Sequence, residues 1–121
     1  MNLNACIQYS ALKPDTLISE AELVCSEAIA RHLPAVCVAP LFVTLAKEKL
    51  QSTEIQVATV VGYPYGYAPV EAKLAEIVLA IVDGAHSLEV VVNTSAAKNG
   101  DWQYLANEIN HILPLALRCF K

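Results

Sequence analysis

The chain has 121 residues, of which 55% are hydrophobic and 17% charged, and its formal net charge is −4. This length suits one domain over residues 1–121, and the hydrophobic fraction excludes a disordered chain. Acidic residues outnumber basic ones and no apolar run approaches the roughly 20 residues that cross a bilayer, so we expect neither a nucleic-acid nor a membrane partner.

Strand-length apolar runs alternate with helical patterns in the first half of the chain. A weak strand candidate covers residues 6–9, and a helix is predicted behind Ser19, whose spacing to Glu22 is typical of a capping box. Residues 35–38 predict a short buried strand, and residues 41–50 a second helix. The apolar face of the first helix is formed by Ala21, Val24, Cys25, Ala28 and Ile29.

The alternation continues in the second half. Residues 55–61 are rich in β-branched side chains and predict a strand. A third helix is expected behind Pro69 and should end at Gly84, since proline suits the first turn and glycine the C-terminal cap. Residues 88–92 give the clearest strand pattern.

A turn at Asn99-Gly100 leads into the last predicted helix, over residues 102–113. Trp102 lies on its apolar stripe and is expected in the core, and Pro114 is expected to close the helix. Four strands therefore alternate with four helices, which is typical of a parallel sheet with right-handed crossovers.

The predicted fold class is α/β: a (βα)₄ half of a TIM barrel, with parallel strands and outer helices. A complete eightfold barrel takes about 250 residues, twice the present length. An open doubly wound sheet is the rival architecture, but a nucleotide-binding sheet would need a G-x-G-x-x-G turn or a Walker loop, and the sequence has neither.

Strand alternation predicts a polar face toward the barrel axis. In the last strand Leu88 and Val90 should meet the helices, which leaves Glu89 and Asn93 facing the axis. The same reasoning places Gln8, Cys37 and Thr59 there. Glu89 is the candidate for proton transfer, whereas Lys98, at the rim after the last strand, either pairs with Glu89 or is a solvated loop lysine. The candidate substrate-lining residues are Gln8, Cys37, Thr59 and Lys98.

Four scattered cysteines show no C-x-x-C pair and no metal-ligand spacing with histidine: Cys6, Cys25, Cys37 and Cys119. Three of them have apolar neighbours, which predicts small buried thiols rather than disulfides or zinc ligands. This usage fits a cytoplasmic protein, and we expect neither a metal nor a cofactor.

A four-stranded half-barrel leaves its axial face uncovered and its two edge strands unpaired. Three arrangements would cover them. We expect a homodimer, which places the last strand of one copy beside the first strand of the other and closes an eight-stranded barrel. The alternatives are a different partner chain that supplies the other half, and a remnant fifth strand over residues 115–120 that covers one edge.

Seven short segments in order along the chain carry a family resemblance: LKPD at 12–15, VCVAP at 36–40, LAKE at 45–48, VATVVGYP at 57–64, and GA, EVVVN and KNGD between 84 and 101. They resemble deoxyribose-phosphate aldolase, over about residues 7–110. The resemblance implies a TIM barrel and a class I aldolase that cleaves 2-deoxyribose 5-phosphate to acetaldehyde and glyceraldehyde 3-phosphate. In that family a strand-six lysine forms the Schiff base, a strand-seven lysine lowers its pKa, a strand-four aspartate transfers protons, and the substrate phosphate sits near the last strands.

Residue by residue, the resemblance places Glu89 at the strand-four aspartate and Gln8 at the strand-one aspartate, and glutamine cannot act as an acid or a base. The asparagine that often precedes the strand-two proline is Ala39 here. The strands that carry the family's lysines and phosphate site have no counterpart, so both are expected to be missing.

The resemblance thus implies a deoxyribose-phosphate aldolase-like protein that is truncated and lacks Schiff-base activity of its own, as a pseudoenzyme or half-barrel. One alternative is an active aldolase on a sugar phosphate when another chain completes it. The other is a small-molecule-binding or regulatory half-barrel.

Overall fold

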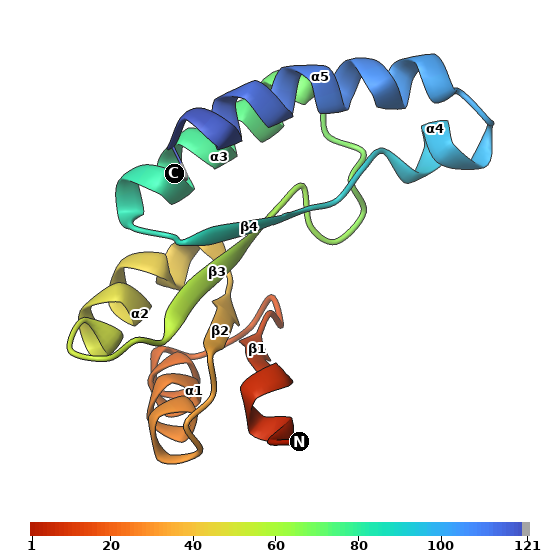
Figure 1. Cartoon of the computed structure of the whole chain (residues 1–121). Coiled ribbons are helices and arrows are strands. Elements are labelled where there is room, and N and C mark those ends of the chain that lie inside the picture. The colour runs from red at the N-terminus through yellow and green to blue at the C-terminus, as the bar shows by residue number, and fades with distance from the viewer. Residues whose placement is uncertain (120–121) are drawn as a thin grey trace.

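A four-stranded parallel sheet in the order β1-β2-β3-β4 forms the centre of the protein, in a computed structural model that describes residues 1–119 (Figure 1). The predicted half of a TIM barrel is confirmed, since strands alternate with helices throughout. The elements in chain order are η1 (Leu3–Cys6), β1 (Gln8–Ala11), α1 (Ile18–Ala30), β2 (Ala35–Val38), η2 (Pro40–Phe42), α2 (Val43–Leu50), β3 (Gln56–Val61), α3 (Val70–Asp83), β4 (Ser87–Val90), α4 (Thr94–Lys98) and α5 (Trp102–Cys119).

The register of the sheet aligns one residue of each strand in a row across it: Ser10, Cys37, Ala58 and Ser87. All three strand pairs are parallel, so the carboxyl ends of the four strands meet at one edge. In barrels built this way, that edge carries the chemistry.

The main core lies between the sheet and the helices. Val36, Val38 and Val57 are fully buried against α1 and α2. Further along, Val61 packs with Ile77 of α3, and α5 joins the same cluster. Burial of these β-branched side chains is what makes their segments strands rather than helices.

Two helix ends test the capping predictions. α3 follows Pro69 and ends at Gly84, which adopts φ 102, as predicted. α1 begins at Ile18, so the predicted cap at Ser19 is wrong. The carboxylate of Glu20 instead accepts a hydrogen bond of 2.7 Å from the Leu17 backbone N–H, and an acidic group also suits the positive end of the helix dipole.

The C-terminal helix corrects three expectations. α5 continues through Pro114, because Ile112 and Leu115 on either side of the proline pack against α3 and β4 and Pro114 itself is exposed. Trp102 is 69% exposed rather than in the core. The remnant fifth strand is wrong for residues 115–119, which are helical, and Phe120 lies outside the described residues.

Among the described cysteine side chains, Cys25 and Cys37 are buried free thiols and Cys6 is an exposed one. The side chain of Cys119 lies outside the described part of the chain. No helix within residues 1–119 is long and apolar enough to cross a membrane.

Candidate functional site

The two edge strands meet through their side chains across the face of the sheet that the helices leave open. Gln8 of β1 donates a hydrogen bond from Nε2 to Oε1 of Glu89 of β4, at 2.5 Å. The two strands are separated by β2 and β3 in the sheet, so this contact spans the whole concave face. The structure therefore brings together two of the residues predicted to face the axis, whose part in binding or catalysis stays a prediction.

Cys37 of β2 belongs to the same face. It is fully buried and packs with Ala58, Val60 and Leu12. Burial raises the pKa of the Cys37 thiol to about 12, and the negative charge of the nearby Glu89 carboxylate adds to the shift. A thiol with this pKa stays protonated at neutral pH and is not a nucleophile as it stands.

Thr59 does not face the axis, and its predicted orientation is wrong. Ala58 and Val60 pack with Cys37 on the axial face, so strand alternation turns Thr59 toward the helices. There its side chain is fully buried and donates a hydrogen bond of 2.7 Å to the carbonyl oxygen of Val38. The hydroxyl is used within the sheet and is not available to a ligand.

The residues after β4 also differ from the prediction. β4 ends at Val90, and Asn93 is the N-cap of α4, where its Oδ1 accepts a hydrogen bond of 2.9 Å from the Ala96 N–H. Asn93 therefore does not line the axis. Lys98 is exposed in the last turn of α4, and no ion pair joins it to Glu89.

A cavity of about 530 Å³ opens at the carboxyl edge of the sheet. Lys13 is the only cation among its lining residues, and the Glu76 carboxylate at its wall accepts a hydrogen bond of 2.6 Å from the Gly62 N–H. Its other walls come from the loop after β1, from η2 and the residue before it, from the end of β3 and from the loop after β3: Leu12, Pro14, Thr16, Ala39, Pro40, Leu41, Phe42, Val60, Tyr63, Pro64 and Tyr65.

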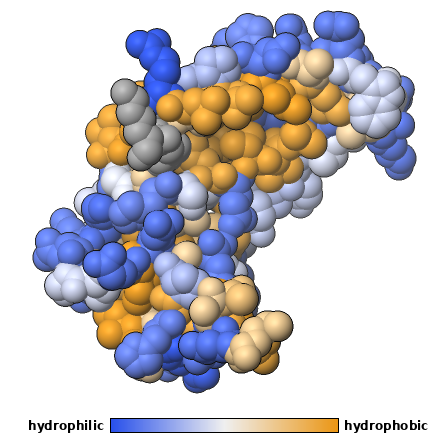
Figure 2. All heavy atoms as spheres, viewed as in Figure 1, coloured by the Kyte–Doolittle hydropathy of each residue, from blue (hydrophilic) through white to orange (hydrophobic). Residues whose placement is uncertain are grey.

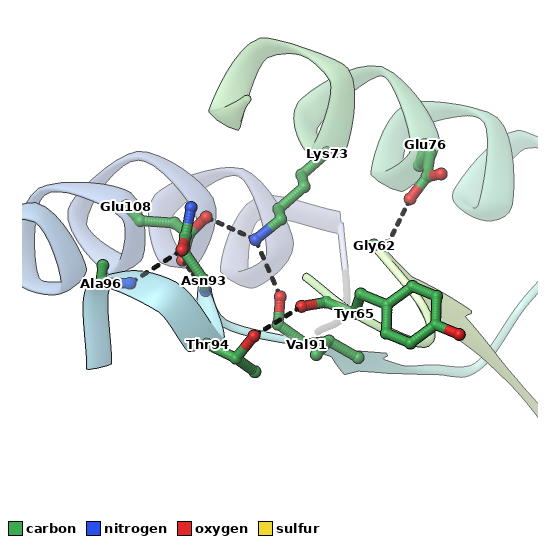
Figure 3. Close-up of polar contacts among 9 residues, drawn as sticks. All are labelled: Gly62, Tyr65, Lys73, Glu76, Val91, Asn93, Thr94, Ala96 and Glu108. Atoms are coloured by element: carbon green, nitrogen blue, oxygen red, sulfur yellow. Dashed lines mark hydrogen bonds and ion pairs between the residues drawn. The ribbon is translucent and has the colours of Figure 1, made fainter. Parts of the chain in front are cut away.

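A buried ion pair fixes the segment that follows β4 (Figure 3). Lys73 of α3 and Glu108 of α5 are almost fully buried, and Nζ lies 2.5 Å from Oε1. Lys73 also donates to the carbonyl oxygen of Val91 at 2.8 Å, and Oε2 of Glu108 accepts from the Asn93 N–H at 3.1 Å. One pair of charges thus links two helices and the exit of the last strand.

Sequence reasoning missed this pair, although the sequence carried a signal for it. Lys73 lies four residues before Ile77, and Glu108 lies four residues before Ile112, so each charge falls on the apolar face of its helix. Opposite charges on the buried faces of consecutive helices predict a pair between them, because neither can be buried alone.

The loop between β3 and α3 packs directly on the segment after β4 (Figure 3). Gly66 has φ 70, and a Cβ added there would lie 2.0 Å from the Val92 carbonyl oxygen. Thr94 donates a hydrogen bond of 3.0 Å to the carbonyl oxygen of Tyr65. Only glycine permits this approach, which holds the tyrosine-rich loop over the carboxyl edge.

The axial face offers one carboxylate, that of Glu89, as a group that can donate or accept a proton. Each lysine within residues 1–119 is placed elsewhere: Lys13 at the rim cavity, Lys47 beside His86, Lys49 with Glu22, Lys73 with Glu108, and Lys98 on α4. No hydrogen bond or ion pair joins any of these five to Glu89. Within the same residues, no three His, Cys, Asp or Glu side chains gather as metal ligands.

Comparison with known proteins gives one consistent family. The sequence pattern described as DeoC/LacD family aldolase matches residues 6–116. A deoxyribose-phosphate aldolase of a Thermoanaerobacter species is 38% identical over 113 residues, covering 93% of this chain and 51% of that protein. Deoxyribose-phosphate aldolase 1 of Bacillus licheniformis is 40% identical over 110 residues, covering 91% and 49%.

Solved structures agree on the fold. Deoxyribose phosphate aldolase from Aeropyrum pernix superposes with a TM-score of 0.86 at 22% identity, covering 98% of this chain and 50% of that one. The chain therefore spans about half the length of the curated relatives and solved structures that it matches.

Proposed function

This chain belongs to the DeoC/LacD family of aldolases, and we propose that it forms the first half of a deoxyribose-phosphate aldolase-like barrel and has no Schiff-base aldolase activity on its own. One observation carries the proposal. The carboxylate of Glu89 accepts its hydrogen bond from the side-chain amide of Gln8, and no lysine within residues 1–119 is hydrogen-bonded to it or forms an ion pair with it.

Within residues 1–119, the lack of a lysine amine beside Glu89 decides which chemistry the axial face can perform. A Schiff base forms when a deprotonated lysine attacks the substrate carbonyl, and that lysine needs burial or a neighbouring cation to lower its pKa. Of the lysines in the described part, Lys73 is buried but pairs with Glu108, and Lys98 is exposed. Glu89 is left as a group that can move a proton with nothing beside it to hold the carbonyl carbon.

Borohydride trapping tests this proposal. The purified chain is incubated with acetaldehyde, and separately with 2-deoxyribose 5-phosphate, and is reduced with borohydride before intact-mass measurement. We expect no mass increase from a reduced imine. The Bacillus licheniformis relative, treated in parallel, shows that the reagents work. A stable adduct mapped to Lys98 or Lys13 would overturn the proposal.

An active aldolase completed by another chain is the second candidate, and the comparisons favour it in one respect. The alignments cover more than 90% of this chain but only about half of each relative. A mixture of this chain with the unmatched C-terminal half of the Bacillus licheniformis relative should then release acetaldehyde from 2-deoxyribose 5-phosphate. Glu89→Gln in the mixture should abolish that release, and a mixture without activity rejects this candidate.

Small-molecule binding at the rim cavity is the third candidate, supported by its volume of about 530 Å³ and by Lys13 in its wall. A cavity of this size suits a small metabolite. Under this candidate, a sugar phosphate raises the melting temperature of the wild-type chain, and Lys13→Gln reduces the increase. An unchanged melting temperature across a sugar-phosphate series rejects it.

A further inference from the structure

Four large apolar side chains of α5 lie exposed along one side of the helix, which we call the α5 stripe. The stripe consists of Trp102, Ile109, Leu113 and Leu117, which are 69%, 47%, 50% and 62% exposed. It runs beside the buried side of the helix, where Ile112 and Leu115 pack against α3 and β4. Figure 2 shows a continuous apolar area over this part of the molecule. Such an area on an otherwise mixed surface marks a site of association.

The position of the α5 stripe follows from how the other helices cover the sheet. α1 contacts both β1 and β2, and α3 packs on β3 and on Leu88 and Val90 of β4. Each of these helices covers its own strand and the next one. α5 packs on α3, and its Ile112 and Leu115 join the cluster that contains Leu88 and Val90 of β4, so the same arrangement would place the outer side of α5 toward the free edge of β4. The stripe would then lie over the place of a fifth strand, next to backbone groups of β4 that have no strand partner within residues 1–119.

At the opposite edge of the sheet, β1 leaves apolar side chains exposed on the side that faces the helices. β1 is the other edge strand, and Ile7 and Tyr9 on its helix side are 45% and 42% exposed. They line a groove of about 340 Å³ between β1 and α1, which we call the β1 groove; its other walls are Asn4, Glu27, Arg31 and Leu33. Within residues 1–119, β1 has α1 on one side only and lacks a second helix on its outer side, whereas α5 at the opposite edge has no strand beneath its outer side.

We propose that a second copy of this chain docks its β1 beside β4, so that the α5 stripe of each protomer covers the β1 groove of the other. Both halves of the contact are present on one chain, which is why we assign the partner as a second copy. β1 and β4 have the same length of four residues. A two-fold axis generates both contacts together and leaves no free edge, because the eight strands close into a ring. This inference concerns assembly and does not depend on the proposed chemistry.

Light scattering across a concentration series is the first test. Wild-type protein should have the mass of a dimer at tens of micromolar. Leu113→Glu in the stripe and Tyr9→Glu in the groove should each raise the concentration of half-dissociation at least tenfold. Asn107→Glu adds the same charge to an exposed position on the polar side of α5 and should leave the dimer unchanged. Circular dichroism confirms that all variants are folded.

Mixing the two disrupted variants distinguishes this arrangement from stripe-to-stripe pairing. A mixed dimer of Leu113→Glu and Tyr9→Glu chains has one contact with both charges and one wild-type contact. We therefore expect the mixture to dimerise more tightly than either variant alone. A wild-type monomer at these concentrations, a dimer that both charged variants leave intact, or a mixture no tighter than its components overturns the proposal.

Discussion

At the scale of single residues, the burial of the charged side chains of Lys73 and Glu108 costs free energy, and the contacts between them must offset that cost. Removing two charges from water costs several kcal/mol for each ion, and a direct contact with further hydrogen bonds is needed to offset it. Here Nζ of Lys73 has the carboxylate and the Val91 carbonyl oxygen, and the second carboxylate oxygen has the Asn93 N–H. The pair therefore depends on both partners being present.

Replacing only Lys73 should be severe. Lys73→Met leaves Glu108 buried without its cation, and we expect the free energy of unfolding to fall by about 3–5 kcal/mol. Adding Glu108→Leu removes the stranded charge and should recover much of the loss. Urea unfolding at pH 7 measures both. Lys49→Met, which breaks the exposed pair with Glu22, is the control and should cost about 0–1 kcal/mol. Equal losses in the two single variants would contradict the argument.

The lowered pKa of His86 predicts that the folded protein is less stable at acidic pH. Its Nδ1 accepts a hydrogen bond of 2.9 Å from the Val57 N–H, and its Nε2 lies 3.0 Å from Nζ of Lys47. Burial, and then the charge of Lys47, lower the pKa of His86 below its ordinary value of 6.5. The unfolded chain therefore takes up the proton first, so stability is full above pH 6.5 and is lost as the pH falls through the folded-state pKa.

We expect the urea midpoint of the wild-type chain to be lower at pH 5 than at pH 7.5. His86→Asn keeps an acceptor for the Val57 N–H but does not titrate, so the difference between the two midpoints should shrink. If the variant shows the same difference as the wild type, other groups cause the acid sensitivity.

At the scale of elements, two glycines with nearly the same φ allow two costs of an added side chain to be compared. One cost is backbone strain, and the other is a steric clash of the new Cβ with its neighbours. Gly100 has φ 68, and an added Cβ would meet nothing nearer than 3.9 Å, so Gly100→Ala should cost about 1–2 kcal/mol. Gly66→Ala adds a collision with the Val92 carbonyl and should cost clearly more. Thermal unfolding of the two variants compares them. Equal costs would mean that the loop moves away from β4 freely.

The elements also show what the sequence can determine. Residues 35–38 and 55–61 are apolar on both faces, so their identity as buried strands follows from composition and length. Because both faces of these strands are apolar, the pattern does not show which side chains face the helices, and for this reason the orientation predicted for Thr59 is wrong. Local rules also placed the end of α5 at Pro114, whereas packing against α3 extends the helix past it.

At the scale of the whole molecule, the site depends on curvature that no local pattern contains. Alternation predicted that Gln8 and Glu89 face the same side, but their contact requires the sheet to bend until its edge strands approach. The Lys73–Glu108 pair likewise requires α3 and α5 to lie side by side. The helical pattern marks Lys73 and Glu108 as charges on apolar faces, but only the tertiary arrangement shows which partner each of them has.

Amide hydrogen exchange should distinguish the central strands of the sheet from its edge strands. In dilute solution we expect the amides of the central strands β2 and β3 to exchange slowest, and those of β1 and β4 faster, since in the part of the chain that the structure describes each edge strand pairs with a single neighbour. Raising the protein concentration into the range of the proposed dimer should slow β1 and β4 selectively. A uniform slowing of all four strands, or none, would not agree with pairing at the edges.

The direction of α5 has a consequence for building larger proteins. Each helix returns the chain to the end of the sheet at which strands begin, so the last described turn of α5 lies near where the first strand of a neighbouring copy would start. A tandem fusion of two copies through a short linker should then form the ring within a single polypeptide. The linker would replace association between molecules with a high local concentration, and the fused protein would keep its mass and its protected edges on extreme dilution.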